Sequence, residues 1–139
     1  MSISQNLNVK DVMTRGVITM SLNTSVKDIA KIIVESHVHG VCVTDEFGEI
    51  AGIVSEMDII KAFNRDINKV TAEEIMSDKV VTISGEDYVE KAVDVMVKRK
   101  IHRILVVLGE DRKDSVLSLP KRPVGILSLT DVIKLMAKD

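Results

Sequence analysis

Gly52-Ile53-Val54-Ser55-Glu56-Met57-Asp58 is the stretch that decides the fold, because a second copy stands 73 residues later as Gly125-Ile126-Leu127-Ser128-Leu129-Thr130-Asp131. Both copies run from glycine through two apolar residues to serine, with aspartate three positions after that serine. An apolar run of this length is typical of a buried strand, and Ser-x-x-Asp is typical of the first turn of a helix. Each copy therefore predicts a strand that turns directly into a helix, and the repetition predicts two similar units.

A second series of matches, at an offset of 63 residues, extends the repeat toward the N-terminal side. Val12-Met13 recurs as Ile75-Met76. Five apolar residues with the i, i+3, i+4, i+7, i+8 spacing of an amphipathic helix are Val26, Ile29, Ala30, Ile33 and Val34. Their counterparts in the second copy are Val89, Ala92, Val93, Met96 and Val97. Because all five positions stay apolar, the repeat includes this helix.

Each repeat is predicted to fold as β-α-β-β-α. In the first repeat we expect a helical turn at 9–13, extended chain at 17–20, a helix capped by Thr24 or Ser25, strands at 38–44 and 50–55, and a helix at 57–64 with Ile59, Ile60 and Phe63 facing inward. In the second repeat we expect a turn at 72–76, extended chain at 80–83, a helix started by Asp87 with Glu90, strands at 101–108 and 124–128, and a helix at 130–137 with Val132, Ile133 and Met136 facing inward.

The domain organisation follows from this order. Repeat one spans 9–64, the linker 65–70, and repeat two 71–138. About ten extra residues lie in the polar stretch 108–123, which holds both prolines and predicts a surface loop. A unit of about 60 residues is marginally stable alone. We therefore expect an α/β (α+β) protein whose two repeats pack face to face.

The composition excludes several classes of protein. The 139 residues include 2% aromatic residues and no tryptophan, and a net charge of −2 arises from 19 basic and 21 acidic side chains. Both features argue against nucleic acid as a partner. Cys42 is the only cysteine, which excludes an internal disulfide and a thiolate-rich metal site. With no signal-peptide pattern and no apolar run of about 20 residues, a soluble cytoplasmic protein without a membrane contact is expected.

Two tandem β-α-β-β-α units, each ending in Gly-apolar-apolar-Ser-x-x-Asp before a helix, resemble a tandem CBS-domain pair (a Bateman module), and are similar to the stand-alone two-repeat CBS proteins of prokaryotes. The resemblance covers about residues 9–138. It implies a module of pseudo-twofold symmetry with two clefts between the repeats. It also implies that these clefts bind adenosine ligands such as AMP, ADP, ATP or S-adenosylmethionine, that the module senses rather than catalyses, and that two copies pair into a flat homodimer.

The resemblance also implies which residues bind the ligand, with each cleft drawing on both repeats. The first cleft would use Ile53, Ser55, Met57, Asp58, Val80, Val81, Ile101, His102 and Arg103. The second cleft would use Ser128, Thr130, Asp131 and His102, together with Gly16, Ile18, Val38, His39 and Gly40.

The chemistry of these residue types agrees with such a ligand. One carboxylate, that of Asp58 or Asp131, can accept hydrogen bonds from both hydroxyls of a ribose. Hydroxyls at Ser55 and Ser128, beside the first free amides of a helix, suit a phosphate. Arg103 gives the first cleft a permanent cation where the second has Gly40, so electrostatics favours the first cleft for a phosphorylated ligand.

Alternatives stay open at this point. Ser-x-x-Asp is also the signature of a helix cap, and His39 and His102 can be solvent-facing strand residues. The pair His37 and His39 has no further ligand placed beside it in the sequence, so no metal or cofactor is expected. No catalytic motif occurs, so no enzymatic activity is expected. The competing functional hypotheses are an S-adenosylmethionine sensor and a ligand-free scaffold that dimerises or docks on a partner enzyme.

Overall fold

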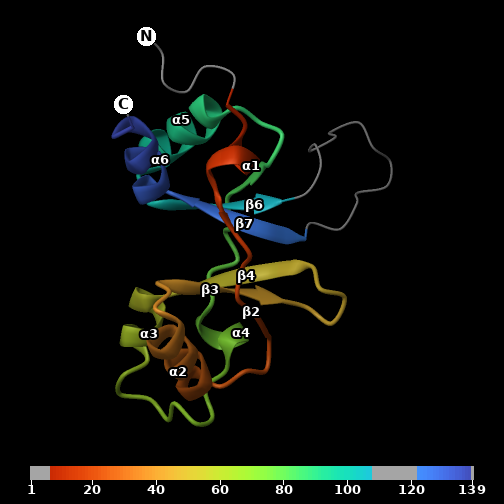
Figure 1. Ribbon diagram of the computed structural model, residues 1–139. Helices are drawn as coiled ribbons and strands as arrows, with labels where there is room; N and C mark the ends of the chain where they lie inside the picture. The colour runs from red at the N-terminus through yellow and green to blue at the C-terminus, as the bar shows by residue number, and fades with distance from the viewer. Residues whose placement is uncertain (1–6, 108–121, 139) are drawn as a thin grey trace. The chain divides into compact units, whose positions relative to one another are not determined.

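The computed structural model describes residues 7–107 and 122–138, and the chain forms two compact units (Figure 1). One unit consists of residues 17–80, and the other combines residues 1–16 with 81–139. Each unit therefore contains the strands and main helices of one repeat, together with the segment that precedes the other repeat in the sequence.

The unit of residues 17–80 contains a three-stranded sheet with helices on one face (Figure 1). Its elements are β2 (Thr19–Ser21), α2 (Val26–Ser36), β3 (Gly40–Thr44), β4 (Ile50–Ser55), α3 (Glu56–Lys61) and α4 (Ala72–Ile75). Strand β3 lies in the centre, parallel to β2 and antiparallel to β4. The core centres on Ile29, Val43 and Val54, each completely buried.

The second unit repeats this arrangement and adds one strand. Its elements are α1 (Val9–Val12), β1 (Thr14–Arg15), β5 (Thr82–Ser84), α5 (Val89–Arg99), β6 (Arg103–Val107), β7 (Pro123–Ser128) and α6 (Leu129–Met136). The sheet order is β1-β7-β6-β5, with β5 parallel to β6 and the other pairs antiparallel. The predicted order of elements is therefore confirmed in both repeats. The predicted loop 108–123 lies outside the described residues except for its last two, and Pro123 begins β7.

The N-terminal segment is an integral part of the second unit. Val9 is completely buried, and its amide donates a hydrogen bond of 2.8 Å to the carbonyl of Asp87. β1 then pairs with β7. Residues 71–77 occupy the equivalent place in the other unit, where Ala72 is completely buried and Ser77 pairs with Ile53. Each sheet is thus covered by a short helix that arrives from outside its own repeat.

The two long helices begin differently. As one of the two predicted alternatives, Ser25 caps α2, accepting a hydrogen bond of 3.2 Å from the amide of Asp28. The prediction that Asp87 caps α5 is wrong. Tyr88 holds the N-cap position without a side-chain bond, because the Asp87 carboxylate accepts from the Ser84 amide (3.2 Å) and pairs with Lys91 (3.3 Å).

The inward orientation predicted for the last helix of each repeat is only partly correct. Ile59 and Val132 pack against the cores. Ile60, Phe63, Ile133 and Met136, by contrast, are exposed by 64%, 80%, 60% and 60%. α3 and α6 each rest on their sheet through one narrow side, so the other apolar side chains face outward.

A glycine in each sheet allows the incoming segment to pass closely over it. A Cβ at Gly52 would lie 2.6 Å from Sδ of Met76 and 2.7 Å from the carbonyl oxygen of Ser77. A Cβ at Gly125 would lie 2.7 Å from both Sδ of Met13 and the carbonyl oxygen of Thr14. Only glycine fits here without displacing backbone.

We predict that Gly125→Ala lowers the free energy of unfolding by about 1–3 kcal/mol, because the methyl group overpacks against the backbone of β1. Urea denaturation measures the effect. Gly85→Ala is the matched control, since its Cβ would approach the Lys10 side chain only to 3.3 Å. Equal losses for the two variants would contradict the close approach.

Candidate functional site

The turn from β4 into α3 is closed by reciprocal hydrogen bonds between Ser55 and Asp58. Oδ2 of Asp58 accepts from the amide of Ser55 (2.8 Å) and from its hydroxyl (2.9 Å). In return, the amide of Asp58 donates to Oγ of Ser55 (3.3 Å). The capping interpretation of Ser-x-x-Asp is therefore confirmed in the first repeat, and the carboxylate is held in a fixed orientation.

The turn from β7 into α6 has the same geometry. Oδ2 of Asp131 accepts from the amide of Ser128 (3.0 Å), and the amide of Asp131 donates to Oγ of Ser128 (3.1 Å). Here the hydroxyl of Thr14 also donates to Oδ1 of Asp131 (3.1 Å). Sequence reasoning missed Thr14. The 63-residue offset could have found it, since it aligns Thr14 with Ser77, a hydroxyl in both repeats.

The two carboxylates consequently differ in what they can still bind. Both oxygens of Asp131 already accept hydrogen bonds. Oδ1 of Asp58 accepts none from any residue in the ranges 7–107 and 122–138. Because Asp58 is half-buried and not paired with a cation there, this oxygen is available to a donor such as a hydroxyl group.

Most of the predicted residues gather at one end of the sheet within each unit. In residues 17–80, Gly40 pairs with Ser55, the amide of Glu56 donates to the carbonyl of His39 (3.3 Å), and the amide of Cys42 donates to that of Ile18 (3.0 Å). This end holds Ile18, Val38, His39, Gly40, Ser55, Met57 and Asp58. Ile53 lies two residues earlier on β4, and Val80 ends the unit.

The matching end of the second unit is built in the same way. Arg103 pairs with Ser128, the amide of Leu129 donates to the carbonyl of His102 (3.0 Å), and the amide of Leu105 donates to that of Val81 (3.3 Å). This end holds Val81, Ile101, His102, Arg103, Ser128, Thr130 and Asp131. Each unit thus assembles one half of the predicted ligand-binding residues.

Gly16 lies apart from this group. Its amide donates to the carbonyl of Val124 (3.0 Å), at the beginning of β7, whereas Ser128 ends that strand. Four residues of extended chain correspond to about 13 Å.

The charged side chains at these sheet ends are exposed and differ between the units. His39 contacts Glu56 (Nδ1 to Oε1, 3.2 Å). Arg103 and His102 are exposed, and within the part of the chain that the structure describes Arg103 makes no ion pair. Among the same residues, no three His, Cys, Asp or Glu side chains are grouped so as to hold a metal ion. Burial raises the pKa of the Cys42 thiol to about 11.

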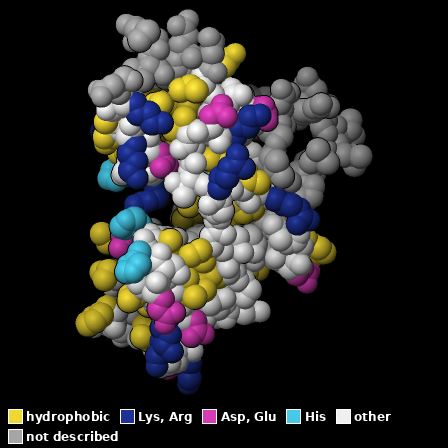
Figure 2. Space-filling view, viewed as in Figure 1, with side chains coloured by type: hydrophobic (Ala, Val, Ile, Leu, Met, Phe, Trp, Pro, Cys, Tyr) yellow, Lys and Arg dark blue, Asp and Glu magenta, His cyan; other side chains and the backbone are white. Residues whose placement is uncertain are grey.

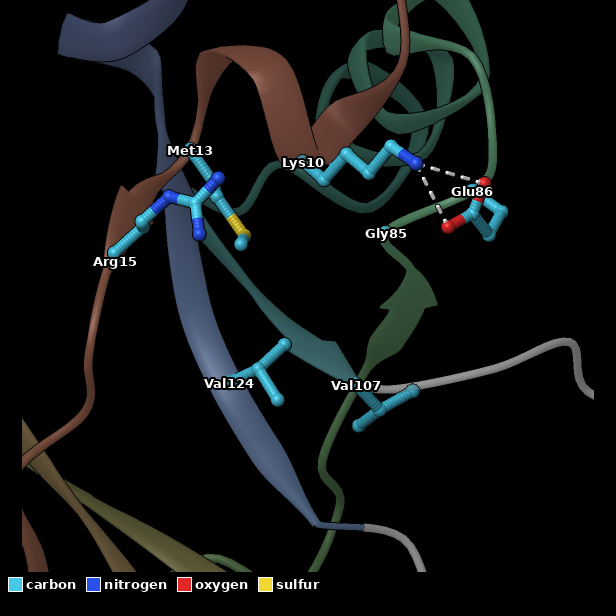
Figure 3. A pocket seen from close by; sticks show the side chains of 7 residues that line it. All are labelled: Lys10, Met13, Arg15, Gly85, Glu86, Val107 and Val124. Carbon is cyan, nitrogen blue, oxygen red and sulfur yellow. Dashed lines mark hydrogen bonds and ion pairs between the residues drawn. The ribbon is translucent and has the colours of Figure 1, made fainter.

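Each unit also contains a shallow cavity. One of about 260 Å³ is lined by Asp58 with Lys61, Ala62, Arg65, Glu74 and Ile75. The other, of about 290 Å³, is lined by Lys10, Met13, Arg15, Gly85, Glu86, Val107 and Val124, with Lys10 turned toward Glu86 (Figure 3). Only the first includes a predicted ligand-binding residue.

A family model described as "CBS domain" matches the chain twice, over residues 9–65 and 72–138. The chain belongs to the CBS domain family. Its fold matches the crystal structure of the CBS domain pair of protein MJ0100 in complex with 5′-methylthioadenosine and S-adenosyl-L-methionine, with a TM-score of 0.76, 32% identity and coverage of 93% of this chain and 94% of that one. A conserved CBS domain protein of unknown function from Thermoplasma acidophilum is similar as well (TM-score 0.76, 28% identity, covering 92% and 68% of the two chains).

Curated relatives of this CBS pair include longer enzymes. An L-aspartate semialdehyde sulfurtransferase of Methanocaldococcus jannaschii is 32% identical over 127 residues, which is 91% of this chain and 23% of that protein. A second such enzyme, from Methanosarcina acetivorans, is 30% identical over 94% of this chain and 24% of its own length. The chain thus spans about a quarter of the length of these relatives. Among the described residues, no helix has the length and apolar character that crossing a membrane requires.

We predict that Ser55→Ala and Ser128→Ala each lower the free energy of unfolding by about 1 kcal/mol, because each removes the oxygen that accepts from the helix amide. Urea denaturation of the purified chain gives the values. Ser36→Ala, at the exposed end of α2, should change stability by less than about 0.5 kcal/mol. A loss for Ser36→Ala as large as for the other two variants would contradict a specific capping role.

Proposed function

We propose that this CBS pair is a regulatory module that binds an adenosine ligand and catalyses no reaction itself. The observation that carries the proposal is the carboxylate of Asp58, held in place through Oδ2 while Oδ1 remains open to a hydroxyl donor. A ribose offers two neighbouring hydroxyls, which a single carboxylate can accept. Support also comes from the 32% identical CBS pair of MJ0100, which was crystallised with two adenosine-containing ligands.

The proposed ligand-binding residues are those that gather at the two sheet ends. Asp58 and Asp131 would accept from ribose, and Ser55, Ser128 and Thr130 would lie near a phosphate or its equivalent. Apolar residues such as Ile53 and Val81 would contact adenine. Arg103 is exposed and unpaired among the described residues, which favours AMP, ADP or ATP over an uncharged nucleoside at the site that Arg103 joins.

The test uses variants that keep the helix caps intact. Asparagine at position 58 or 131 retains an oxygen that can accept from the serine amide, but it has lost the charge and one acceptor. We predict that AMP, ATP or S-adenosylmethionine at 100 times its dissociation constant stabilises the wild-type chain by about 2.7 kcal/mol. Asp58→Asn together with Asp131→Asn should remove that gain, as measured by thermal unfolding with and without ligand.

Glu46→Gln is the control for this experiment, because Glu46 is exposed in the turn between β3 and β4, far from Ser55 along both strands. It should respond to ligand as the wild type does. If no adenosine compound stabilises the wild type at millimolar concentration, the ligand-free scaffold is the correct function. A double variant that still responds in full would refute the assignment of the two aspartates.

We further propose that the module acts as a homodimer. Its helices expose large apolar side chains at equivalent positions of both repeats: Val34 with Val97, Ile60 with Ile133, and Phe63, just after α3, with Met136. Figure 2 shows hydrophobic side chains on the surface over α3, beside the histidines. Apolar patches of this kind on a soluble protein favour association. A second copy of the chain carries the same pair of patches and so can cover both at once.

We predict that Ile60→Glu combined with Ile133→Glu yields a monomer, because association would then bury two unpaired carboxylates per chain. Sedimentation velocity over a range of concentrations distinguishes monomer from dimer. Phe47→Glu is a matched control, since Phe47 is 65% exposed but lies in the turn between β3 and β4. A dimer that survives the double substitution would exclude these helices from the interface.

A further inference from the structure

The charges of the two long helices are inverted between the repeats. At the 63-residue offset, four charged residues of α2 coincide with four of α5, and at each position the sign is opposite. The residues of α2 are Lys27, Asp28, Lys31 and Glu35, and those of α5 are Glu90, Lys91, Asp94 and Lys98. All eight are exposed. The apolar positions between them keep their character, so the inversion is confined to the outer surface.

The inversion extends to the surroundings of the exposed apolar residues. Val97 (68% exposed) precedes three consecutive cations, Lys98, Arg99 and Lys100, and α6 adds Lys134. Val34 (72% exposed) precedes Glu35, and α3 begins with Glu56. Whole units differ likewise. Residues 17–80 contain 6 basic and 11 acidic side chains, and the rest of the chain contains 13 and 10.

We propose that the dimer is antiparallel, so that α2 and α3 of one chain face α5 and α6 of the second copy. This inference rests on the homodimer proposed above and specifies which surfaces meet. A twofold axis between two identical helix pairs brings each residue near its own copy. In a parallel dimer the cations at residues 98–100 would therefore approach the same three cations. In an antiparallel dimer they approach Glu35, and the net charges of the facing units are opposite in sign.

Charge reversal at one position of each helix tests the orientation. Glu35→Lys places a cation against Lys98 of the second copy, and Lys98→Glu places a carboxylate against Glu35. We expect either single variant to weaken the dimer about tenfold, since two symmetry-related contacts become repulsive. The double variant, in which the charges are exchanged, should restore the dissociation constant to within about threefold. Glu46→Lys, in the turn between β3 and β4, controls for net charge and should leave the constant unchanged.

A parallel dimer predicts the opposite pattern. Lys98→Glu would then relieve the crowding of cations and strengthen association, and the double variant would show no rescue. That result would overturn the proposed orientation. Added salt provides a further readout: at 0.5 M NaCl the wild-type dimer should weaken if opposite charges face each other, and strengthen if like charges do.

Distances between spin labels report the orientation directly. Labels are attached to Ser36→Cys in α2 and to Arg99→Cys, its counterpart in α5, while the native Cys42 is only 2% exposed and stays unlabelled. We expect a longer distance between two chains labelled at 36 than between one labelled at 36 and one at 99. The reverse order would overturn the antiparallel arrangement while the homodimer stands. A wild-type chain that stays monomeric at all concentrations would refute the homodimer itself.

Discussion

The reciprocal hydrogen bonds between a serine at the end of a strand and the aspartate three residues later are the constraint on which the candidate site depends. They satisfy helix amides that would otherwise lack partners, and they fix one carboxylate oxygen in each repeat. Capping and ligand binding are therefore compatible uses of the same side chain. With one oxygen of Asp58 engaged, the other is held ready to accept a hydrogen bond, so little conformational freedom is lost on binding.

The repeats are alike in backbone but different in polar detail. Thr14 occupies the second oxygen of Asp131, whereas the corresponding oxygen of Asp58 is open to a donor. A ligand at Asp131 would compete with the Thr14 hydroxyl, which lies on the segment that enters the unit from the N-terminal side. This difference gives a physical reason for unequal affinities at the two aspartates, and it links the residue-131 site to the packing of β1.

Much of the fold could be predicted because a repeated pattern constrains each element twice. The strand over Ile50–Ser55 has the predicted bounds, since glycine and Ser-x-x-Asp delimit it on both sides. The burial of Ile60 and Phe63 could not be predicted. An amphipathic spacing shows that a helix has an apolar face, but it does not tell whether this face meets the protein's own core or stays exposed. The cap of α5 was predicted wrongly because Asp87 had two possible partners, the helix amides and the Ser84 amide, and only packing decides between them.

The arrangement of the candidate site was predictable only in outline. Pairing of Gly40 with Ser55, and of Arg103 with Ser128, follows from the strand order, and these pairs assemble the polar residues at one sheet end. Thr14 was missed because its contact spans 117 residues of sequence. Gly16 lies at the far end of β7 from Ser128, since the direction of β1 could not be deduced from the sequence.

The most direct test of the account is a crystal structure of the chain grown with AMP or S-adenosylmethionine. The account predicts that the ribose hydroxyls lie within 3.2 Å of the carboxylate of Asp58, of Asp131, or of both, with the serine caps unchanged. A ligand bound elsewhere, with both carboxylates engaged only by their caps and Thr14, would contradict it.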